Sequence, residues 1–324
     1  MDIVIASLLL IVSLFLVIKG GDVFVESSQD IAKRLKMPKI VFGATIASVA
    51  TTLPELLIAI FSSIDGSTEL AVGNSVGSML CNYGLILGIC FTVKNCDLSR
   101  GGMLKYILSL IVAGVIFIFG LFGQITNVMA YALLGLSVLY FVVNYIDAKS
   151  LDKKSPKKKV ADNESTKPLY LTILMFVLGA GAIGGGAYLL VDKVEFLAKV
   201  IGISEQFVGL TIVAVGTSLP ELVVVLKCIK TDTPSLGIGN IIGSSILNVT
   251  LILAVAKLVA FNDKMTITNE TAFISLPLAL LFSLLFLLPI LFTKKTYKFQ
   301  GIIFLIVYSL YIVFLLCNIL FKFI

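Results

Sequence analysis

The chain has 324 residues, 58% of them hydrophobic, with a mean hydropathy of +1.07 and a formal net charge of +6. Soluble domains contain about 45–50% apolar residues, so this composition excludes an ordinary soluble protein and indicates a membrane protein. The chain has no histidine, and none of its five cysteines belongs to a Cys-x-x-Cys pair. A zinc site, histidine acid–base catalysis and a disulfide scaffold therefore lack the residues they need. We expect no resident cofactor and no nucleic-acid partner.

Ten apolar windows follow one another along the chain, each close to the roughly 20 residues that cross a hydrocarbon core of about 30 Å. We expect the first five membrane helices near residues 2–19, 40–62, 70–93, 103–122 and 126–146. The second five are expected near residues 168–191, 206–229, 236–258, 271–293 and 301–322. The longest polar stretch, residues 148–167, is too short for a soluble catalytic domain, so we predict that the protein is not an enzyme.

Lysine and arginine placement predicts the orientation. If the 148–167 linker is cytoplasmic, the loops on its side hold 19 of the 25 basic residues and the opposite loops hold five. The remaining residue, Lys19, then falls at the cytoplasmic end of helix one. Basic residues concentrate in cytoplasmic loops, so both termini are expected to face outside.

The linker itself contains seven lysines and few apolar residues. Such a composition is typical of a disordered, solvated connector. The functional alternative is that the lysines of residues 149–159 bind anionic lipid headgroups, at about 1 kcal/mol per residue near the membrane surface.

The second group of five helices repeats the first. GATIASVATTLPELLIA (43–59) matches GLTIVAVGTSLPELVVV (209–225) at 9 of 17 positions, and GNSVGSMLCN (73–82) matches GNIIGSSILN (239–248) at 5 of 10. Both pairs are offset by 166 residues, which indicates duplication of the whole unit. Because five is odd, the second copy enters the membrane from the opposite side, a plan that recurs in secondary transporters. We predict an all-α polytopic membrane protein of ten transmembrane helices in two inverted five-helix repeats, residues 1–147 and 168–324.

The positions retained in both copies are polar rather than lipid-facing. Each forms part of an i, i+4 pair, so the two members of a pair share one helix face. The pairs are Thr51 and Glu55, Ser78 and Asn82, Thr217 and Glu221, and Ser244 and Asn248.

Two prolines add main-chain oxygens to this set. Pro54 and Pro220 lack an N–H and clash with the carbonyl four residues earlier, so each must kink or break its helix. Carbonyls freed at membrane depth are tolerated where they line a cavity. This makes four carbonyls candidate ligands, those of Ser48, Thr51, Ala214 and Thr217.

These donors are all oxygen atoms, which suit hard cations, and Ca²⁺ takes about 6–8 oxygens. Two carboxylates neutralise one Ca²⁺ or two Na⁺, so the two ions should compete, which is the basis of exchange. A single glutamate in a membrane helix is also explained by protonation, or by pairing that serves only helix packing. Two at a duplicated position favour an ion pathway, because burying charge in a membrane is costly.

At these residues the sequence resembles the prokaryotic type of the sodium/calcium exchanger family, within the cation/calcium antiporter superfamily. That family carries G-T-S-x-P-E and G-N-x-x-G-S-x-x-x-N/D in two alpha repeats, and the resemblance extends over essentially the whole chain. It implies a core of helices 2, 3, 7 and 8 against which the long helices 1 and 6 slide. It also implies that Na⁺ influx drives Ca²⁺ extrusion across a prokaryotic cell membrane.

The resemblance further implies roles for individual residues. Glu55 and Glu221 would be the central ligands shared by Ca²⁺ and Na⁺. Further ligands would be the carbonyls of Thr51 and Thr217, the hydroxyls of Thr52, Ser218, Ser78 and Ser244, and, at two flanking Na⁺ positions, the carbonyls of Ser48 and Ala214.

Three positions depart from the family pattern. Ala50 replaces the usual glycine and Thr52 the usual serine. Both keep the ligand chemistry of the motif but add side-chain volume in the first repeat. Asn248 stands where some microbial members have aspartate, so an Asn82/Asn248 pair resembles the potassium-independent exchangers. The short linker also leaves no room for the calcium-sensing domains of the animal proteins.

Two rival functions stay open. An H⁺/Ca²⁺ antiporter on the same fold would bind protons on the two glutamates, but the acidic G-N-x-x-E signature of that branch is absent from the two motifs. A cation channel could also use an all-oxygen site, although inverted repeats weigh against it.

Overall fold

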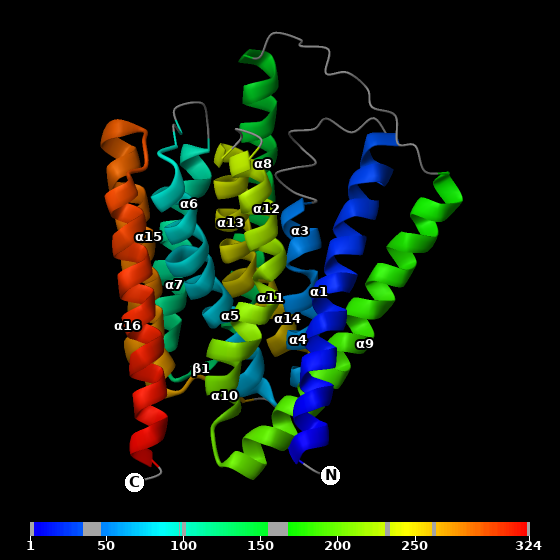
Figure 1. Ribbon diagram of the computed structural model, residues 1–324. Coiled ribbons are helices and arrows are strands. Elements are labelled where there is room, and N and C mark those ends of the chain that lie inside the picture. The colour runs from blue at the N-terminus through cyan, green and yellow to red at the C-terminus, as the bar shows by residue number, and fades with distance from the viewer. Residues whose placement is uncertain are drawn as a thin grey trace.

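The computed structural model describes residues 3–34, 47–96, 98, 102–154, 168–230, 234–260 and 264–322, and it is built almost wholly of helices (Figure 1). Within this part of the chain, nine helices are long and apolar enough to cross a membrane. A shorter apolar helix, α4 (Leu53–Ile64), lies at the end of the predicted window 40–62, whose first residues fall outside the described part. The predicted all-helical membrane fold is confirmed.

The described part of the first repeat contains seven α-helices, one π-helical segment (η) and a short strand. These are α1 (Ile3–Arg34), α3 (Ala47–Thr51), α4 (Leu53–Ile64), α5 (Thr68–Cys81), η2 (Asn82–Leu87), α6 (Gly88–Val93), α7 (Met103–Gly120), β1 (Gln124–Ile125) and α8 (Asn127–Lys154). The second repeat has the equivalent membrane helices in the same order, but its strand precedes the fourth of them instead of following it. Its elements are α9 (Leu169–Ile201), α10 (Glu205–Val208), η3 (Gly209–Val213), α11 (Ala214–Thr217), α12 (Leu219–Lys230), α13 (Pro234–Leu247), η4 (Asn248–Ile252), α14 (Leu253–Val259), β2 (Met265–Thr266), η5 (Thr271–Ser275), α15 (Leu276–Thr293) and α16 (Lys298–Lys322).

Helices α1 and α9 form a long pair on one side of the molecule (Figure 1). They have 32 and 33 residues, well beyond the predicted windows 2–19 and 168–191. Lys19 therefore lies near the middle of α1, and its predicted place at the cytoplasmic end of helix one is wrong. The helix continues past Lys19 because Gly20 and Gly21 are packed against other helices rather than ending the turn.

The contact between α1 and α9 follows the 166-residue offset of the sequence repeat. A Cβ on Gly20 would lie 3.0 Å from the carbonyl oxygen of Gly179, and a Cβ on Gly186 would lie 3.1 Å from that of Ser13. Gly20 is equivalent to Gly186, and Ser13 is equivalent to Gly179. Exchanging the two repeats therefore converts one of these contacts into the other. Such a reciprocal contact is what a two-fold relation between the repeats produces. Small residues at this seam let the two backbones approach closely.

Helix α8 also runs further than expected, to Lys154. Residues 148–154 of the predicted connector are therefore helical. The rest of the connector, residues 155–167, lies outside the described residues.

Two clips join the repeats at opposite ends of the bundle. At one end β1 pairs antiparallel with β2, with Ile125 opposite Met265. At the other end, Cys96 N donates to Thr296 Oγ1 and Thr296 N donates to Cys96 O, both at 3.0 Å. Each clip joins a loop of one repeat to a loop of the other, so the helices flanking these loops are fixed relative to one another.

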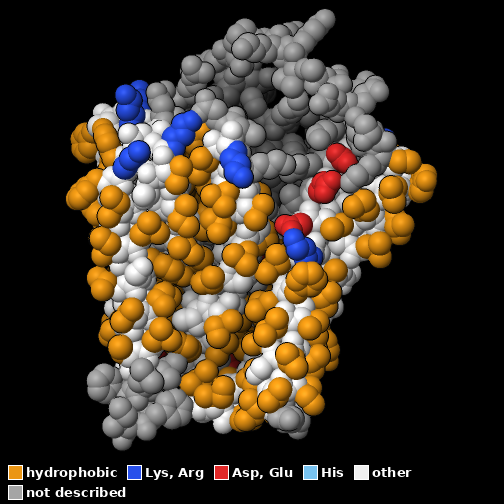
Figure 2. Space-filling view, in the orientation of Figure 1, with side chains coloured by type: hydrophobic (Ala, Val, Ile, Leu, Met, Phe, Trp, Pro, Cys, Tyr) orange, Lys and Arg blue, Asp and Glu red, His pale blue; other side chains and the backbone are white. Residues whose placement is uncertain are grey.

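The outer surface fits a membrane. On the face shown in Figure 2 the sides are mainly hydrophobic, and most lysine and arginine side chains lie toward one end. That is the end where α8 finishes and α9 begins, while both chain termini lie at the other end (Figure 1). This arrangement agrees with inverted repeats, and the compartment that each end faces stays a prediction.

A labelling experiment tests that orientation. In a chain whose five native cysteines are replaced, Asp65→Cys should react with an impermeant thiol reagent added to intact cells. Lys295→Cys should react only after the membrane is permeabilised. Both positions are exposed at opposite ends of the bundle, so accessibility depends on the compartment alone. The reverse labelling pattern would overturn the orientation.

Candidate functional site

Both proline-containing helices are broken at the same point of their repeats. Helix α3 ends at Thr51 and α4 begins at Leu53, with Thr52 between them at φ −87° and ψ 2°. In the second repeat α11 ends at Thr217 and α12 begins at Leu219, with Ser218 at φ −81° and ψ 0°. Pro54 and Pro220 thus fall in the first turn of the following helix, where a missing N–H costs nothing.

The break places a glutamate at the start of a helix in each repeat. Glu55 and Glu221 lie in the first turns of α4 and α12, and each is 1% exposed. The positive end of a helix dipole stabilises a carboxylate at this position. A capping box of the form Thr-x-x-Glu would also place a glutamate here. However, the Thr52 side chain does not cap α4, and its hydroxyl donates to Ser48 O at 2.9 Å.

Each broken helix contacts the motif helix of the other repeat. Thr51 Oγ1 of α3 lies 3.4 Å from Ser244 Oγ of α13, and Thr217 Oγ1 of α11 lies 3.5 Å from Ser78 Oγ of α5. Ser244 Oγ also donates to Glu221 Oε1 at 3.3 Å. The site is therefore assembled from both repeats, with equivalent residues in equivalent contacts.

The two carboxylates are close enough to interact electrostatically with each other. Thr217 lies beside Glu55, and Thr51 lies beside Glu221. Among the described residues, neither oxygen of Glu55 nor Oε2 of Glu221 accepts a hydrogen bond, and neither glutamate forms a salt bridge. A buried carboxylate without compensation costs several kcal/mol. The pair therefore requires a positive charge or a proton.

Asn82 and Asn248 lie one helical turn beyond the motif serines. They are 1% and 0% exposed, and their amide atoms make no hydrogen bond with any other described residue. Each begins a π-helical segment, η2 and η4, at positions 166 residues apart. Single-turn π segments occur frequently at functional sites, and the sequence pattern did not predict them.

Two further asparagines belong to the site but were not among the predicted ligands. Asn74 Nδ2 donates to Glu55 O at 3.4 Å, and Thr217 Oγ1 donates to Asn74 Oδ1 at 3.3 Å. Asn240, its equivalent in α13, accepts from Ser48 Oγ at 3.2 Å. The spacing could have identified them, because Asn74 precedes Ser78 by four residues, just as Ser78 precedes Asn82.

The carbonyls of Ser48 and Ala214 are not free in this structure. Ser48 O accepts from Thr52 N and Ala214 O from Ser218 N, each at 3.1 Å. Side-chain hydroxyls fill the remaining lone pairs, because those of Thr51 and Thr52 donate to Ser48 O and that of Thr217 donates to Ala214 O. An ion at either carbonyl would therefore have to displace one of these hydroxyls. The twelve predicted ligands are all buried, at most 4% exposed: Ser48, Thr51, Thr52, Glu55, Ser78, Asn82, Ala214, Thr217, Ser218, Glu221, Ser244 and Asn248.

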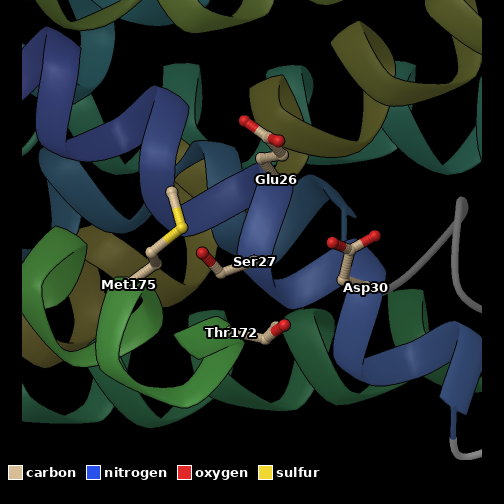
Figure 3. Close-up of a pocket in the computed structure, with 5 residues that line it drawn as sticks. All are labelled: Glu26, Ser27, Asp30, Thr172 and Met175. Atoms are coloured by element: carbon tan, nitrogen blue, oxygen red, sulfur yellow. The ribbon is translucent and has the colours of Figure 1, made fainter. Parts of the chain in front are cut away.

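A small depression lies between α1 and α9, apart from this buried site (Figure 3). Glu26, Ser27 and Asp30 of α1 line it together with Thr172 and Met175 of α9. Ser27 Oγ donates to Val23 O and Thr172 Oγ1 donates to Pro168 O. Both hydroxyls thus already donate to the backbone carbonyl four residues earlier. The depression shares no residue with the predicted site.

Comparison with known proteins gives consistent matches over the whole chain. The family model described as "Sodium/calcium exchanger protein" matches twice, over residues 5–146 and 171–317. An uncharacterized membrane protein of Methanocaldococcus jannaschii is 31% identical over 302 residues, covering 92% of this chain and 94% of the relative. The sodium/calcium exchanger MaX1 of Methanosarcina acetivorans is 28% identical over 344 residues, covering 94% and 97%.

The fold is also similar to a solved structure. The sodium-calcium exchanger NCX_Mj, soaked with 2.5 mM Na⁺ and 10 mM Sr²⁺, superposes with a TM-score of 0.67 at 27% sequence identity. The match covers 96% of this chain and 99% of that one. The two halves matched by the family model contain the two broken helices and the two motif helices described above.

The role of Asn74 in holding the site together gives a stability prediction. Asn74→Ala removes two contacts and leaves buried polar groups unsatisfied, which should cost about 1–3 kcal/mol of unfolding free energy. Thermal unfolding of the purified protein in detergent measures this. The matched control is Ser62→Ala, because among the described residues the buried Ser62 hydroxyl bonds only to Ala59 O of its own helix. Equal stability of the two variants would contradict the role of Asn74.

Proposed function

The chain belongs to the sodium/calcium exchanger protein family, and from this premise we propose that it is a secondary active antiporter that exchanges Na⁺ for Ca²⁺. In this proposal the ions bind at a midplane site made by both repeats, and the site opens alternately to the two sides of the membrane. The family places the chain among cation transporters rather than enzymes. The pairing of Na⁺ with Ca²⁺ is the part that is proposed.

One observation carries the proposal: the buried pair Glu55 and Glu221, with three carboxylate oxygens that accept no hydrogen bond from the described residues. The pair brings two negative charges, which one Ca²⁺ or two Na⁺ would neutralise. Once one Ca²⁺ or two Na⁺ are bound, no negative charge of the carboxylates is left to hold the other ion. Ca²⁺ and Na⁺ would therefore displace each other. This competition converts a Na⁺ gradient into Ca²⁺ movement.

The surrounding oxygens suit both ions. We propose Glu55 and Glu221 as the central ligands shared by Ca²⁺ and Na⁺. The further ligands in the proposal are the hydroxyls of Thr52, Ser78, Ser218 and Ser244, the carbonyls of Ser48, Thr51, Ala214 and Thr217, and the amides of Asn82 and Asn248. A set of this kind reaches the coordination number of about 6–8 that Ca²⁺ requires.

The position of α1 supports alternating access. A Cβ on Gly21 would lie 3.6 Å from Pro220 Cγ and 4.0 Å from Pro54 Cγ. Helix α1 thus crosses both helix breaks, next to the residues that would hold the ions. A shift of the α1–α9 pair relative to the clipped helices would change which end of the site is covered.

The rival within the same fold is an H⁺/Ca²⁺ antiporter, in which the same two carboxylates would bind protons. Ca²⁺ uptake into proteoliposomes decides between them, with an outward gradient of Na⁺, of K⁺ or of protons in parallel samples. Uptake driven by Na⁺ alone is the expected result. Uptake driven equally by a pH gradient would favour the rival, and single-channel currents would instead indicate a channel.

We propose a prokaryotic cell membrane as the location, with both termini outside and the 148–167 linker in the cytoplasm. Lysines of residues 149–159 would bind anionic lipid headgroups there. Their side chains lie outside the described residues, so this contact stays a prediction.

Neutralising either glutamate tests the charge count. Glu55→Gln and Glu221→Gln keep the side-chain volume but remove half of the negative charge. Loss of one charge from a buried ion site costs about 3–5 kcal/mol, so Na⁺-driven Ca²⁺ flux should fall at least roughly 100-fold. Asp65→Asn, an exposed position, is the matched control and should keep flux. Near-normal flux in either well-folded glutamine variant would refute the assignment.

Transport should not require K⁺. The neutral Asn248 limits the core to two carboxylates, and no charge is left to hold K⁺ beside Ca²⁺. Asp22 and Asp192 do not add to this count, because they form salt bridges with Lys19 and Lys193. Replacing K⁺ by choline on both sides, at a clamped membrane potential, should leave flux unchanged.

The matched comparison is Asn248→Asp, which adds a third carboxylate and should make flux respond to K⁺. A strict K⁺ requirement in the unmodified protein would show that the charge count is wrong.

A further inference from the structure

Tyr140 is a buried tyrosine on α8, a helix with one buried face and one exposed face. Its neighbours on α8, Val138 and Leu139, are 60% and 45% exposed, whereas Tyr140 is 0% exposed. Asn144, one turn further along α8, is 1% exposed. Helix α8 therefore directs a polar face, Tyr140 and Asn144, away from the membrane and into the protein.

The Tyr140 hydroxyl reaches the centre of the second motif. A Cβ on Gly243 would lie 2.2 Å from that hydroxyl oxygen and 2.7 Å from Ser48 Oγ. The hydroxyl interacts with the side chains of Ser48 and Asn144. Position 243 therefore requires glycine, because the hydroxyl oxygens of Tyr140 and Ser48 occupy the space that a Cβ would need.

Ser48 connects this contact to α13. Its Oγ donates to Asn240 Oδ1 at 3.2 Å, while the Tyr140 hydroxyl lies beside Ser48 Oγ on one side and the Asn144 side chain on the other. The result is a chain from Asn144 through Tyr140 and Ser48 to Asn240, which joins α8, α3 and α13.

The second repeat does not reproduce this chain. The residue equivalent to Ser48 is Ala214, which has no hydroxyl. The residue equivalent to Gly243 is Gly77, and the three atoms nearest to a Cβ there belong to Ala214 and Leu210. The two flanking positions of the site therefore differ, and the one at Ser48 is anchored from α8.

We propose that Tyr140 is a positioning residue for the flanking Na⁺ position at Ser48, and that its hydroxyl strengthens Na⁺ binding there without a matching effect on Ca²⁺. The inference rests on the proposed Na⁺/Ca²⁺ exchange. The chain of side chains fixes α3, whose Ser48 carbonyl would bind Na⁺. It makes no contact with the Glu55 and Glu221 carboxylates, which lie on α4 and α12 and would dominate Ca²⁺ binding.

The test is Tyr140→Phe, assayed for Ca²⁺ flux in proteoliposomes against Na⁺ and Ca²⁺ concentration. The Na⁺ concentration for half-maximal exchange should rise about three- to tenfold, the expected effect of losing one hydrogen bond. The Ca²⁺ concentration for half-maximal Ca²⁺/Ca²⁺ self-exchange, measured without Na⁺, should change less than about twofold. The matched control is Tyr83→Phe, because Tyr83 is equally buried but bonds Ser109 of α7, a helix that contributes no proposed ligand. It should change neither value.

A double-mutant cycle separates positioning from a general loss of stability. Ser48→Ala keeps the carbonyl, removes the hydroxyl and should raise the Na⁺ requirement as Tyr140→Phe does. The double variant should then be no worse than the poorer single variant. Additive effects, or equal factors on the Na⁺ and Ca²⁺ requirements, would overturn the inference and leave the exchange function standing. An unmodified protein without Na⁺-driven flux would instead overturn the proposed function, and this inference with it.

Discussion

Two carboxylates held together inside a membrane protein are the constraint around which the rest of this structure is arranged. Glu55 and Glu221 are almost fully buried and interact with each other, so their charges repel unless something positive lies between them. Three features reduce the free-energy cost of burying these two charges. Each glutamate lies in the first turn of a helix, each helix follows a break, and hydroxyls of the opposite repeat lie beside each carboxylate. These features lower the penalty without neutralising the charge, which leaves a site that favours cations.

Much of this arrangement could be predicted from the sequence, because duplication had left a record of it. The 166-residue offset identified the broken helices, the glutamates and the motif serines, and hydropathy identified the membrane helices. The lengths of α1 and α9 were missed, since Gly20 ends an apolar window in the sequence but packs against Gly179 in the fold. Asn74 was missed because an asparagine next to a glycine is typical of a turn as well as of a ligand site. Contacts between distant segments, such as that of Tyr140 with Ser48, leave no local pattern.

The fold consists of helices tied together by the two clips and of the α1–α9 pair, which would move in the proposed exchange. The two clips tie loops of one repeat to loops of the other at both ends of the bundle, and they hold the helices on one side of the site. On the other side α1 and α9 meet along a seam of small residues and cross the helix breaks at Gly21. Smooth, glycine-lined contacts resist sliding less than interlocked side chains do. Relative motion is therefore most favourable between the α1–α9 pair and the clipped helices.

The two repeats differ at a few residues, and these differences bear on whether the outward-open or the inward-open state has the lower free energy. In two identical inverted repeats, exchanging the roles of the halves converts the outward-open state into the inward-open one, and the two would have equal free energy. Here Ser244 bonds Glu221, Glu55 accepts no such bond among the described residues, and Tyr140 anchors Ser48 while Ala214 has no equivalent anchor. A difference of about 1.4 kcal/mol between the states changes their ratio tenfold. One or two hydrogen bonds present in a single repeat therefore suffice to favour one orientation of the site in the absence of ions.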